Sequence, residues 1–396
     1  MDVQVRQGDT LWLYSQLFRI PLNLLLDSNR NINPASLNIG QIVKIPGYRL
    51  QTYTIKAGDS LWRISQQRGL PLDSLLLVNP NVNPNNLQVG QRINLPSRVT
   101  TPVVRGQRVY DYAALQQDLE QLLELYPFIE RRQIGSSVMG KNLDELIVGR
   151  GNKRVHINAS FHANEWITTP ILMQTLNAYL LALTNNTDIR GRDILPFYNY
   201  VTLSIVPMVN PDGVDLVIHG APNVEPYRSN VLSINGGRTD FSGWKANIRG
   251  VDLNNQFPAL WEQQAAANVK QPAPRDFPGY QPLSEPETIA MAALTRNGNF
   301  NRVLAYHTQG KVIYWGFEGL EPPESQTIVN EFARVSGYQP IRYVESWAGY
   351  KDWFIYEFRR PGFTVELGRG VNPLPLSQFG EIYEENLGIF LASLYM

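Results

Sequence analysis

The stretch RVHINASFHANEW, residues 154–166, joins a strand-like run to a pair of potential metal ligands. Its first half, residues 154–160, is apolar enough to be a buried strand. His162 and Glu165 follow where that strand would end, three positions apart. In open α/β sheets, ligand sites form beyond the carboxyl ends of the strands. The stretch therefore predicts a central sheet with a candidate site at its edge.

Outward from this stretch, strand-like and helical segments alternate through residues 108–396. This rhythm predicts an α/β fold with a sheet flanked by helices. In the helix expected within 110–127, Leu115, Leu119, Leu122 and Leu123 share one face. A second helix is expected over 167–183, and further strands over 200–213, 302–307 and 362–367. His307 and Glu366 each lie at the end of such a strand.

The histidines and glutamates at the expected strand ends predict one metal site at the edge of the sheet. A catalytic zinc takes three protein ligands, and two histidines with one glutamate form an established set. We therefore expect one zinc ion per chain, held by His162, Glu165 and His307, with Glu366 as the base. Of the other two histidines, we interpret His156 as a core residue or one that supports a ligand, and His219 as a loop residue that is exposed or contacts substrate.

The composition of the chain limits the classes of molecule that we expect it to bind. The 35 basic residues cancel the 35 acidic ones, so we expect neither nucleic acid nor membrane as a partner. The absence of cysteine excludes disulfides and thiolate chemistry. The first residues, MDVQVRQGDTLW, carry charges where a signal peptide has its apolar core, and no apolar run has membrane-spanning length. We expect a chain without a signal peptide.

The first hundred residues are two copies of one unit, because the chain matches itself at a shift of 50 residues. Each copy contains GD(T/S)LW, an Asn-Pro turn and a closing VGQ or IGQ segment, and each predicts a small α+β unit of the order βααβ. Residues 47–51, GYRLQ, are expected to join them. The domain boundaries that result are 1–48, 49–97, a linker at 98–107, and 108–396.

Both copies resemble the LysM module. The resemblance implies binding to the N-acetylglucosamine chains of peptidoglycan or chitin, in a groove between the first turn and the NINP or NVNP loop. Twin modules would raise avidity for a repeating polymer. Within the modules we interpret Trp12 and Trp62 as packing residues, whereas the asparagines either form turns or donate hydrogen bonds to the sugar.

Residues 108–396 resemble the zinc metallocarboxypeptidases. The motifs that carry the resemblance are FHANEW, NPDG, WKANIRGVDLNNQFP, HTQG and FTVELG, in that order. The resemblance implies a carboxypeptidase-like mixed sheet with helices, zinc, and Glu366 as general base. It further implies that Asp252 orients His162, that Lys245, or else Arg249, stabilises the oxyanion, and that Asn254, Asn255 and Tyr343 contact substrate.

Three positions depart from the family pattern. The family grips the substrate's terminal carboxylate with an asparagine-arginine pair, but here Asn255 replaces the arginine. An amide cannot replace a charged planar fork at equal strength. Asn164 replaces a second family arginine. Lys351 takes the position at the base of the leaving residue's pocket, where it would favour a distal carboxylate; a solvated surface lysine is the alternative.

The two halves together indicate peptidoglycan. The combination resembles the bacterial γ-D-glutamyl-L-diamino-acid endopeptidases, which implies a stem peptide substrate cut between γ-D-glutamate and diaminopimelate, in the cytoplasm of a sporulating cell or at the spore wall. The alternatives are a zinc carboxypeptidase for ordinary peptides with LysM as an anchor, and a binding protein with an inactive zinc domain. A chitin target stays open.

Overall fold

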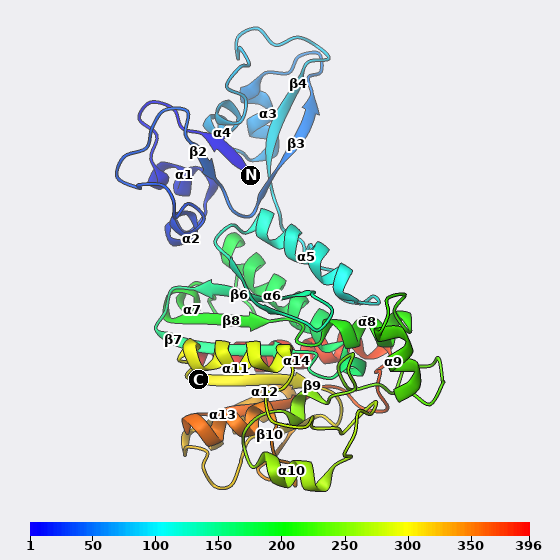
Figure 1. The fold of residues 1–396 in the computed structure, drawn as a ribbon. Helices are drawn as coiled ribbons and strands as arrows, with labels where there is room; N and C mark the ends of the chain where they lie inside the picture. Colours follow the sequence, from blue (N-terminus) through cyan, green and yellow to red (C-terminus); the bar gives the residue numbers. More distant parts are fainter. The chain divides into compact units, whose positions relative to one another are not determined.

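The computed structural model describes residues 1–396 (Figure 1). The chain divides into two compact units. The first comprises Met1–Val103, Asp118–Glu130 and Asn177–Leu195, and the second comprises Val104–Gln117, Arg131–Leu176 and Pro196–Met396. None of the helices combines the length and the apolar character that crossing a membrane requires.

The two modules have the predicted order of elements. The first contains β1 (Asp2–Gln4), α1 (Leu11–Phe18), α2 (Leu22–Asp27) and β2 (Ile42–Lys44), and the second contains β3 (Tyr48–Thr54), α3 (Leu61–Arg68), α4 (Leu72–Leu77) and β4 (Arg92–Arg98). In each, the two strands pair antiparallel. The GD(T/S) motif starts the first helix because Thr10 and Ser60 are its N-caps. The expected joining segment is largely strand, since β3 begins at Tyr48.

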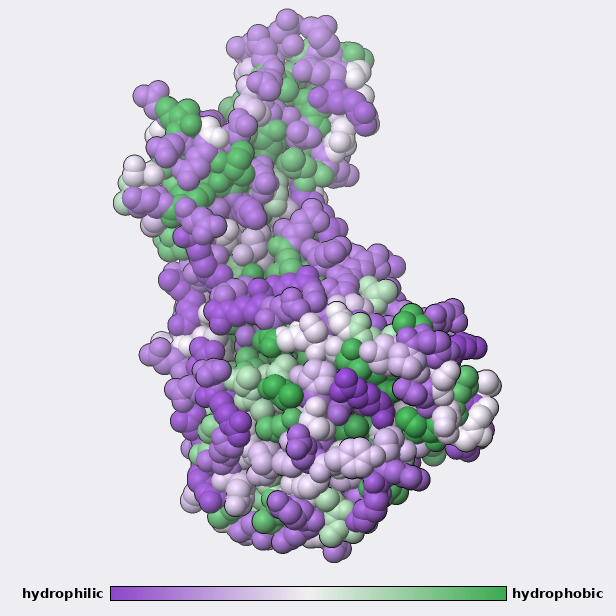
Figure 2. All heavy atoms as spheres, in the orientation of Figure 1, coloured by the Kyte–Doolittle hydropathy of each residue, from purple (hydrophilic) through white to green (hydrophobic).

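One expectation about the modules is wrong. Trp12 and Trp62 are not core residues: 62% and 63% of their surface is exposed, because each stands on the outward side of its helix while Leu11 and Leu61 point inward. Figure 2 shows hydrophobic residues at the surface of the modules among hydrophilic ones.

The asparagines do more than form turns. Asn79 is buried, and its amide nitrogen donates to the carbonyls of Leu75 (2.8 Å) and Asn94 (2.7 Å) while its oxygen accepts from the Asn94 backbone (2.8 Å). Asn29 makes the same three bonds in the first module. One asparagine per module therefore ties the second helix to the closing strand.

The second unit is built on an eight-stranded mixed sheet, as expected. Its order is β11-β10-β12-β9-β7-β8-β6-β5. The central strands β8, β7, β9 and β12 are parallel, whereas β6 and β10 pair antiparallel with their neighbours β8 and β12. The bounds are β5 (Glu130–Ser136), β6 (Asn142–Gly149), β7 (Lys153–Ala159), β8 (Val201–Val206), β9 (Arg302–His307), β10 (Val312–Tyr314), β11 (Gln339–Ile341) and β12 (Gly362–Glu366).

Helices cover both faces of this sheet. Met291 of α11 and Trp353 of α13 pack in one apolar cluster with Val303 and Ala305 of β9. On the opposite face, Phe332 of α12 meets Phe363 of β12, with ring centroids 5.0 Å apart. The helices are α5 (Tyr112–Leu125), α6 (Thr168–Asn185), α7 (Leu195–Tyr200), α8 (Pro211–His219), α9 (Tyr227–Ile234), α10 (Trp261–Ala267), α11 (Pro286–Gly298), α12 (Glu324–Ser336), α13 (Tyr350–Phe358) and α14 (Phe379–Tyr395).

Some local expectations need adjustment. The strand expected over 200–213 ends at Val206, and Pro211 begins α8 with Asn210 as its N-cap. His219 is exposed as expected, but it ends α8 instead of lying in a loop, and its Nε2 lies 2.8 Å from Asp111. His156 is confirmed as a core residue: it is fully buried, stacks on Phe300, and burial lowers its pKa to about 3.

The buried asparagine clamp is open to a direct test. Asn79→Ala leaves buried backbone groups of Leu75 and Asn94 without partners, so we expect a loss of about 2–3 kcal/mol in the stability of the second module. Hydrogen exchange of the β3 and β4 amides measures it. Asn83→Ala, which removes one exposed turn contact to Asn85 (3.0 Å), is the matched control and changes exchange little. Equal effects would contradict the clamp.

Candidate active site

Strand register brings the predicted site residues to one edge of the sheet. β7, β9 and β12 are parallel neighbours, with Ala159 opposite Tyr306 and His307 opposite Glu366. His307 and Glu366 are thus the last residues of adjacent strands. His162 stands three residues beyond the end of β7, at the start of the short 3-10 turn Ala163–Glu165. The expected position at the strand ends is confirmed.

The turn after β7 is held by buried hydroxyl and amide groups. Ser160 adopts a left-handed φ of 52°, and its backbone N–H donates to Thr168 Oγ1 at 3.0 Å. Thr168 Oγ1 in turn donates to the Glu165 carbonyl at 2.8 Å. Asn210, from the NPDG motif, donates to the carbonyls of Phe161 (3.1 Å) and Ala246 (3.0 Å). These bonds fix the backbone that carries both His162 and Glu165.

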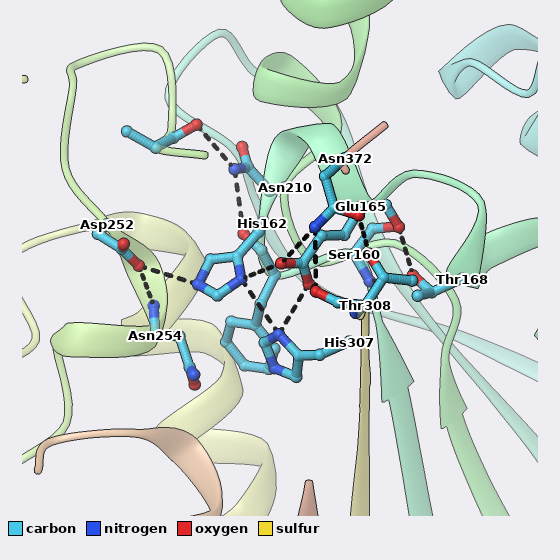
Figure 3. A network of polar contacts seen from close by, with 12 residues as sticks. Ser160, His162, Glu165, Thr168, Asn210, Asp252, Asn254, His307, Thr308 and Asn372 are labelled. Atoms are coloured by element: carbon cyan, nitrogen blue, oxygen red, sulfur yellow. Dashed lines mark hydrogen bonds and ion pairs between the residues drawn. The ribbon is translucent and has the colours of Figure 1, made fainter. Parts of the chain in front are cut away.

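Three side chains converge on one point (Figure 3). His162 Nδ1 lies 2.9 Å from Glu165 Oε1 and 3.1 Å from His307 Nδ1. His307 Nδ1 lies 2.9 Å from Glu165 Oε2. All three residues are buried. The predicted ligand set is therefore brought together, and its three ligand atoms lie within 4.8 Å of one another.

The donors fit zinc. Around a tetrahedral zinc with bonds of about 2.0–2.1 Å, ligand atoms stand about 3.3 Å apart. The observed separations of 2.9–3.1 Å need only a small outward movement. The two facing Nδ1 atoms cannot both donate to each other, so a cation that accepts both lone pairs suits this arrangement better than a hydrogen bond. Two imidazoles and a carboxylate are the donor types that zinc prefers.

Asp252 faces the far side of His162. Its Oδ1 lies 3.1 Å from His162 Nε2, and it also accepts from the Asn254 backbone at 3.2 Å. A proton on Nε2 leaves Nδ1 free as a ligand, so Asp252 selects the tautomer that binds metal. Burial opposes the charge of Asp252, but His162 and Lys245 outweigh it and lower its pKa. The contact expected from the sequence is present.

The buried charges strongly perturb one another. Burial works against charged His162, yet Glu165 and Asp252 raise its pKa to about 9. Burial and the nearby Glu165 charge raise the pKa of Glu366 to about 8. A divalent cation at the three ligands would oppose both shifts, because it adds positive charge beside them.

Glu366 lines one pocket of about 450 Å³ together with two of the three ligands, His162 and Glu165. Of the two cations considered for the oxyanion, Lys245 lines this pocket and Arg249 does not. Burial opposes the charge of Lys245, but Asp252 and Glu165 raise its pKa, so it is a cation there. Arg249 is half exposed and lies 3.4 Å from Glu285, outside the pocket. The geometry favours Lys245.

The three residues expected to contact substrate lie outside the pocket that contains Glu366. Asn254 Oδ1 accepts from the Tyr350 backbone at 3.0 Å, so it holds the start of α13. Asn255 is partly exposed beside it. Tyr343 is 53% exposed, with its hydroxyl 3.3 Å from Glu321. None of these three lines the 450 Å³ pocket.

Of the two interpretations of Lys351, the solvated surface lysine is wrong, because Lys351 is buried. Its Nζ donates to the Gly316 carbonyl at 2.9 Å and pairs with Asp352, so its charge is already used inside the fold. It does not line the pocket. Lys351 is the second residue of α13, and its side chain reaches the loop after β10.

The sequence analysis assigned no role to several pocket residues. Those with polar side chains are Arg275, Thr308, Gln309, Tyr314 and Asn372. Asn372 donates to the Thr308 carbonyl at 3.0 Å and lies 3.4 Å from Glu165 Oε1. A polar residue soon after the end of β12 was a signal that could have found it. Arg275 comes from the irregular stretch APRDFPG, which carries no periodic signal.

Comparisons with known proteins agree with this geometry. A family model described as zinc carboxypeptidase matches residues 115–388, and one described as LysM domain matches residues 3–46 and 53–96. The chain is 64% identical over 396 residues to gamma-D-glutamyl-L-diamino acid endopeptidase 1 of Lysinibacillus sphaericus, covering 100% of both chains.

Solved structures show the fold. Bovine thrombin-activatable fibrinolysis inhibitor, in complex with tick carboxypeptidase inhibitor, is similar with a TM-score of 0.56 and 20% identity, covering 73% of this chain and 97% of that one. Carboxypeptidase A from Helicoverpa armigera has a TM-score of 0.54 and 17% identity, covering 84% of this chain and 81% of its own.

The Asp252 contact predicts a loss of metal affinity. Asp252→Asn removes the acceptor charge behind His162, so we expect the dissociation constant for zinc to rise about 10- to 100-fold. Competition with a chromogenic chelator measures it. Asp276→Asn, which removes a partly exposed carboxylate from a residue whose backbone N–H donates to Asp252, is the control and should leave affinity within a few-fold. Equal losses would show that only net charge matters.

Proposed function

Because the chain belongs to the zinc carboxypeptidase family and carries two LysM domains, we propose that it is a peptidoglycan-bound zinc peptidase that hydrolyses the γ-D-glutamyl–diaminopimelate bond of stem peptides. The family membership confirms the resemblance seen in the motifs. The observation that carries the choice of bond is the 64% identity to an endopeptidase named for it, which runs through both modules and the site. We keep the domain boundaries 1–48, 49–97, 98–107 and 108–396 as part of the proposal.

His162, Glu165 and His307 would hold the zinc that this family uses. When bound, zinc polarises the substrate carbonyl and lowers the pKa of a water ligand to about 7. Glu366 would take the proton from the attacking water and later deliver it to the leaving amine, which its place in the same pocket supports. Asp252 would keep the His162 ring in position.

Lys245 is assigned to the negative charge that develops on the carbonyl oxygen. Of the two candidates, Lys245 and Arg249, it is the one that lines the pocket, and it makes no side-chain hydrogen bond or ion pair that would have to be broken. A preorganised cation at the oxyanion lowers the barrier because no reorganisation is needed when the charge forms. Arg249, already beside Glu285, is left out of the mechanism.

The residues expected to contact the leaving residue of the substrate are consistent with an endopeptidase. Asn255 stands where an arginine would clamp a terminal carboxylate. Without that arginine, the residue after the cleaved bond need not carry the terminal carboxylate, so the substrate can continue beyond it. Asn254, Asn255 and Tyr343 remain our candidates for contacts to the leaving residue. Lys351, whose charge is paired with Asp352 inside the fold, is given no contact in this proposal.

The LysM modules would hold the enzyme on its polymer. We propose that they bind the N-acetylglucosamine-containing glycan of peptidoglycan, so that the peptidase acts on stem peptides attached to it. The exposed Trp12 and Trp62 offer aromatic surface on matching helices of the two modules. The location that goes with this proposal, the cytoplasm of a sporulating cell or the spore wall, rests on the resemblance to enzymes of sporulating bacilli.

The decisive experiment uses two peptides. L-Ala-γ-D-Glu-diaminopimelate and its D-Ala-extended form are incubated with the enzyme, with and without a zinc chelator, and analysed by mass spectrometry. We expect release of L-Ala-D-Glu from both, lost with chelator and in Glu366→Gln. Removal of a C-terminal residue from an ordinary peptide, with neither stem peptide cut, would instead identify a carboxypeptidase that uses LysM as an anchor.

The two candidate cations are separated by matched variants. We expect Lys245→Ala to lower kcat about 100-fold or more, because one oxyanion partner is worth about that factor. Arg249→Ala should change kcat only slightly. Steady-state kinetics on the tripeptide measure both, with zinc content determined for each variant. A larger loss for Arg249→Ala would reverse the assignment.

A further inference from the structure

A second positive side chain lines the pocket without a use in the mechanism above. Arg275 is 58% exposed, and its one ion pair joins Nε to Asp276 at 3.3 Å, beyond the short range of a strong charged hydrogen bond. Its two terminal nitrogens make no hydrogen bond within the chain. A guanidinium presents two parallel donors that fit one carboxylate. The fork of Arg275 is therefore available to a ligand.

The backbone around Arg275 is fixed to the segment that carries Lys245 and Asp252. The Pro274 carbonyl accepts from the N–H groups of Lys245 (2.8 Å) and Ala246 (3.0 Å), and Asp252 N–H donates to the Phe277 carbonyl (2.7 Å). The Asp276 N–H lies 3.3 Å from Asp252 Oδ2. Bonds on both sides of Arg275 thus hold it beside the site, so its position does not depend on a loose loop.

The remaining pocket walls supply no competing charge at this position. Glu165 is engaged by the two histidines, and Glu366 is the base. The other polar lining residues are neutral: Asn164, Thr308, Gln309, Tyr314 and Asn372. With Lys245 assigned to the oxyanion, Arg275 is the surplus positive charge of the pocket. Its chemistry calls for an anionic group on the substrate close to the cleaved bond.

We propose that Arg275 binds the free α-carboxylate of the γ-D-glutamyl residue, on the acyl side of the cleaved bond; this inference rests on the proposed function. In a γ-linked glutamate the side-chain carboxyl forms the amide, so the α-carboxylate stays ionised, separated from the reacting carbonyl carbon by three carbons. The candidates for the leaving residue, Asn254, Asn255 and Tyr343, do not line this pocket, which leaves the Arg275 wall to the acyl side.

The contact makes Arg275 a specificity-determining residue, distinct from Lys245. The α-carboxylate carries its charge both before and during the reaction, so Arg275 stabilises the bound substrate and the transition state alike. Loss of such uniform binding raises KM and leaves kcat nearly unchanged. Lys245, in contrast, meets a charge that exists only in the transition state, and its loss lowers kcat.

The test compares two substrates that differ in one group. L-Ala-γ-D-Glu-diaminopimelate carries the α-carboxylate, and its D-isoglutamine analogue carries a neutral carboxamide there. For Arg275→Gln we expect kcat/KM on the carboxylate peptide to fall about 10- to 100-fold, mainly through KM, and activity on the carboxamide peptide to stay within about twofold. Arg275→Lys should restore part of the preference, because it keeps the charge without the fork.

Controls keep the outcomes separate. Arg369→Gln removes an exposed arginine next to the pocket residue Gly370, and it should leave the preference intact. Zinc content and melting temperature of each variant report folding. Equal loss on both peptides, or no loss on either, would overturn the inference while the proposed function stands. If the unaltered enzyme cuts neither peptide, the proposed function is wrong and the inference falls with it.

Discussion

The alignment of three parallel strand ends is the constraint on which the site depends. β7, β9 and β12 stop at the same edge, so His307 and Glu366 are direct neighbours and His162 comes one short turn later. Burying these charged groups is costly unless each is paired or bound to a cation. The fold meets this cost with a chain of partners that runs from Asp252 through His162 to Glu165 and His307.

The features that depend on residues close together in the chain, such as helix caps and strands, were predictable from the sequence. The 50-residue period, the GD(T/S)LW caps and the strand-like runs each reflect contacts between residues close in the chain, so the βααβ modules and the mixed sheet are confirmed. The ligand set could be inferred from residue type at strand ends. The direction of single side chains on helices was not predictable in this way: Trp12 and Trp62 point outwards and Lys351 is buried, because the direction of a side chain on a helix depends on what the helix packs against.

Residues placed by long-range backbone bonds were not predictable. Arg275 comes from an irregular stretch and reaches the pocket because Pro274 and Phe277 bond to residues around Lys245 and Asp252. Neither side of that pairing has a periodic pattern. The same holds for Asn210, whose motif was visible but whose task, bridging the carbonyls of Phe161 and Ala246, emerges only in the folded chain. Pairings of this kind depend on the whole fold.

The loss of one arginine and the position of another give a single account of how the cleaved bond is chosen. A carboxypeptidase selects the cleaved bond by binding the terminal carboxylate of its substrate. The arginine that would bind this carboxylate is replaced by Asn255 here. The cation of the pocket without a use in the mechanism, Arg275, moves the anchoring charge to the acyl residue. An enzyme anchored there fixes the amide by the glutamyl residue before it and places no demand on the residues beyond the cleaved bond. Endopeptidase action is then a consequence of where the fixed positive charge stands.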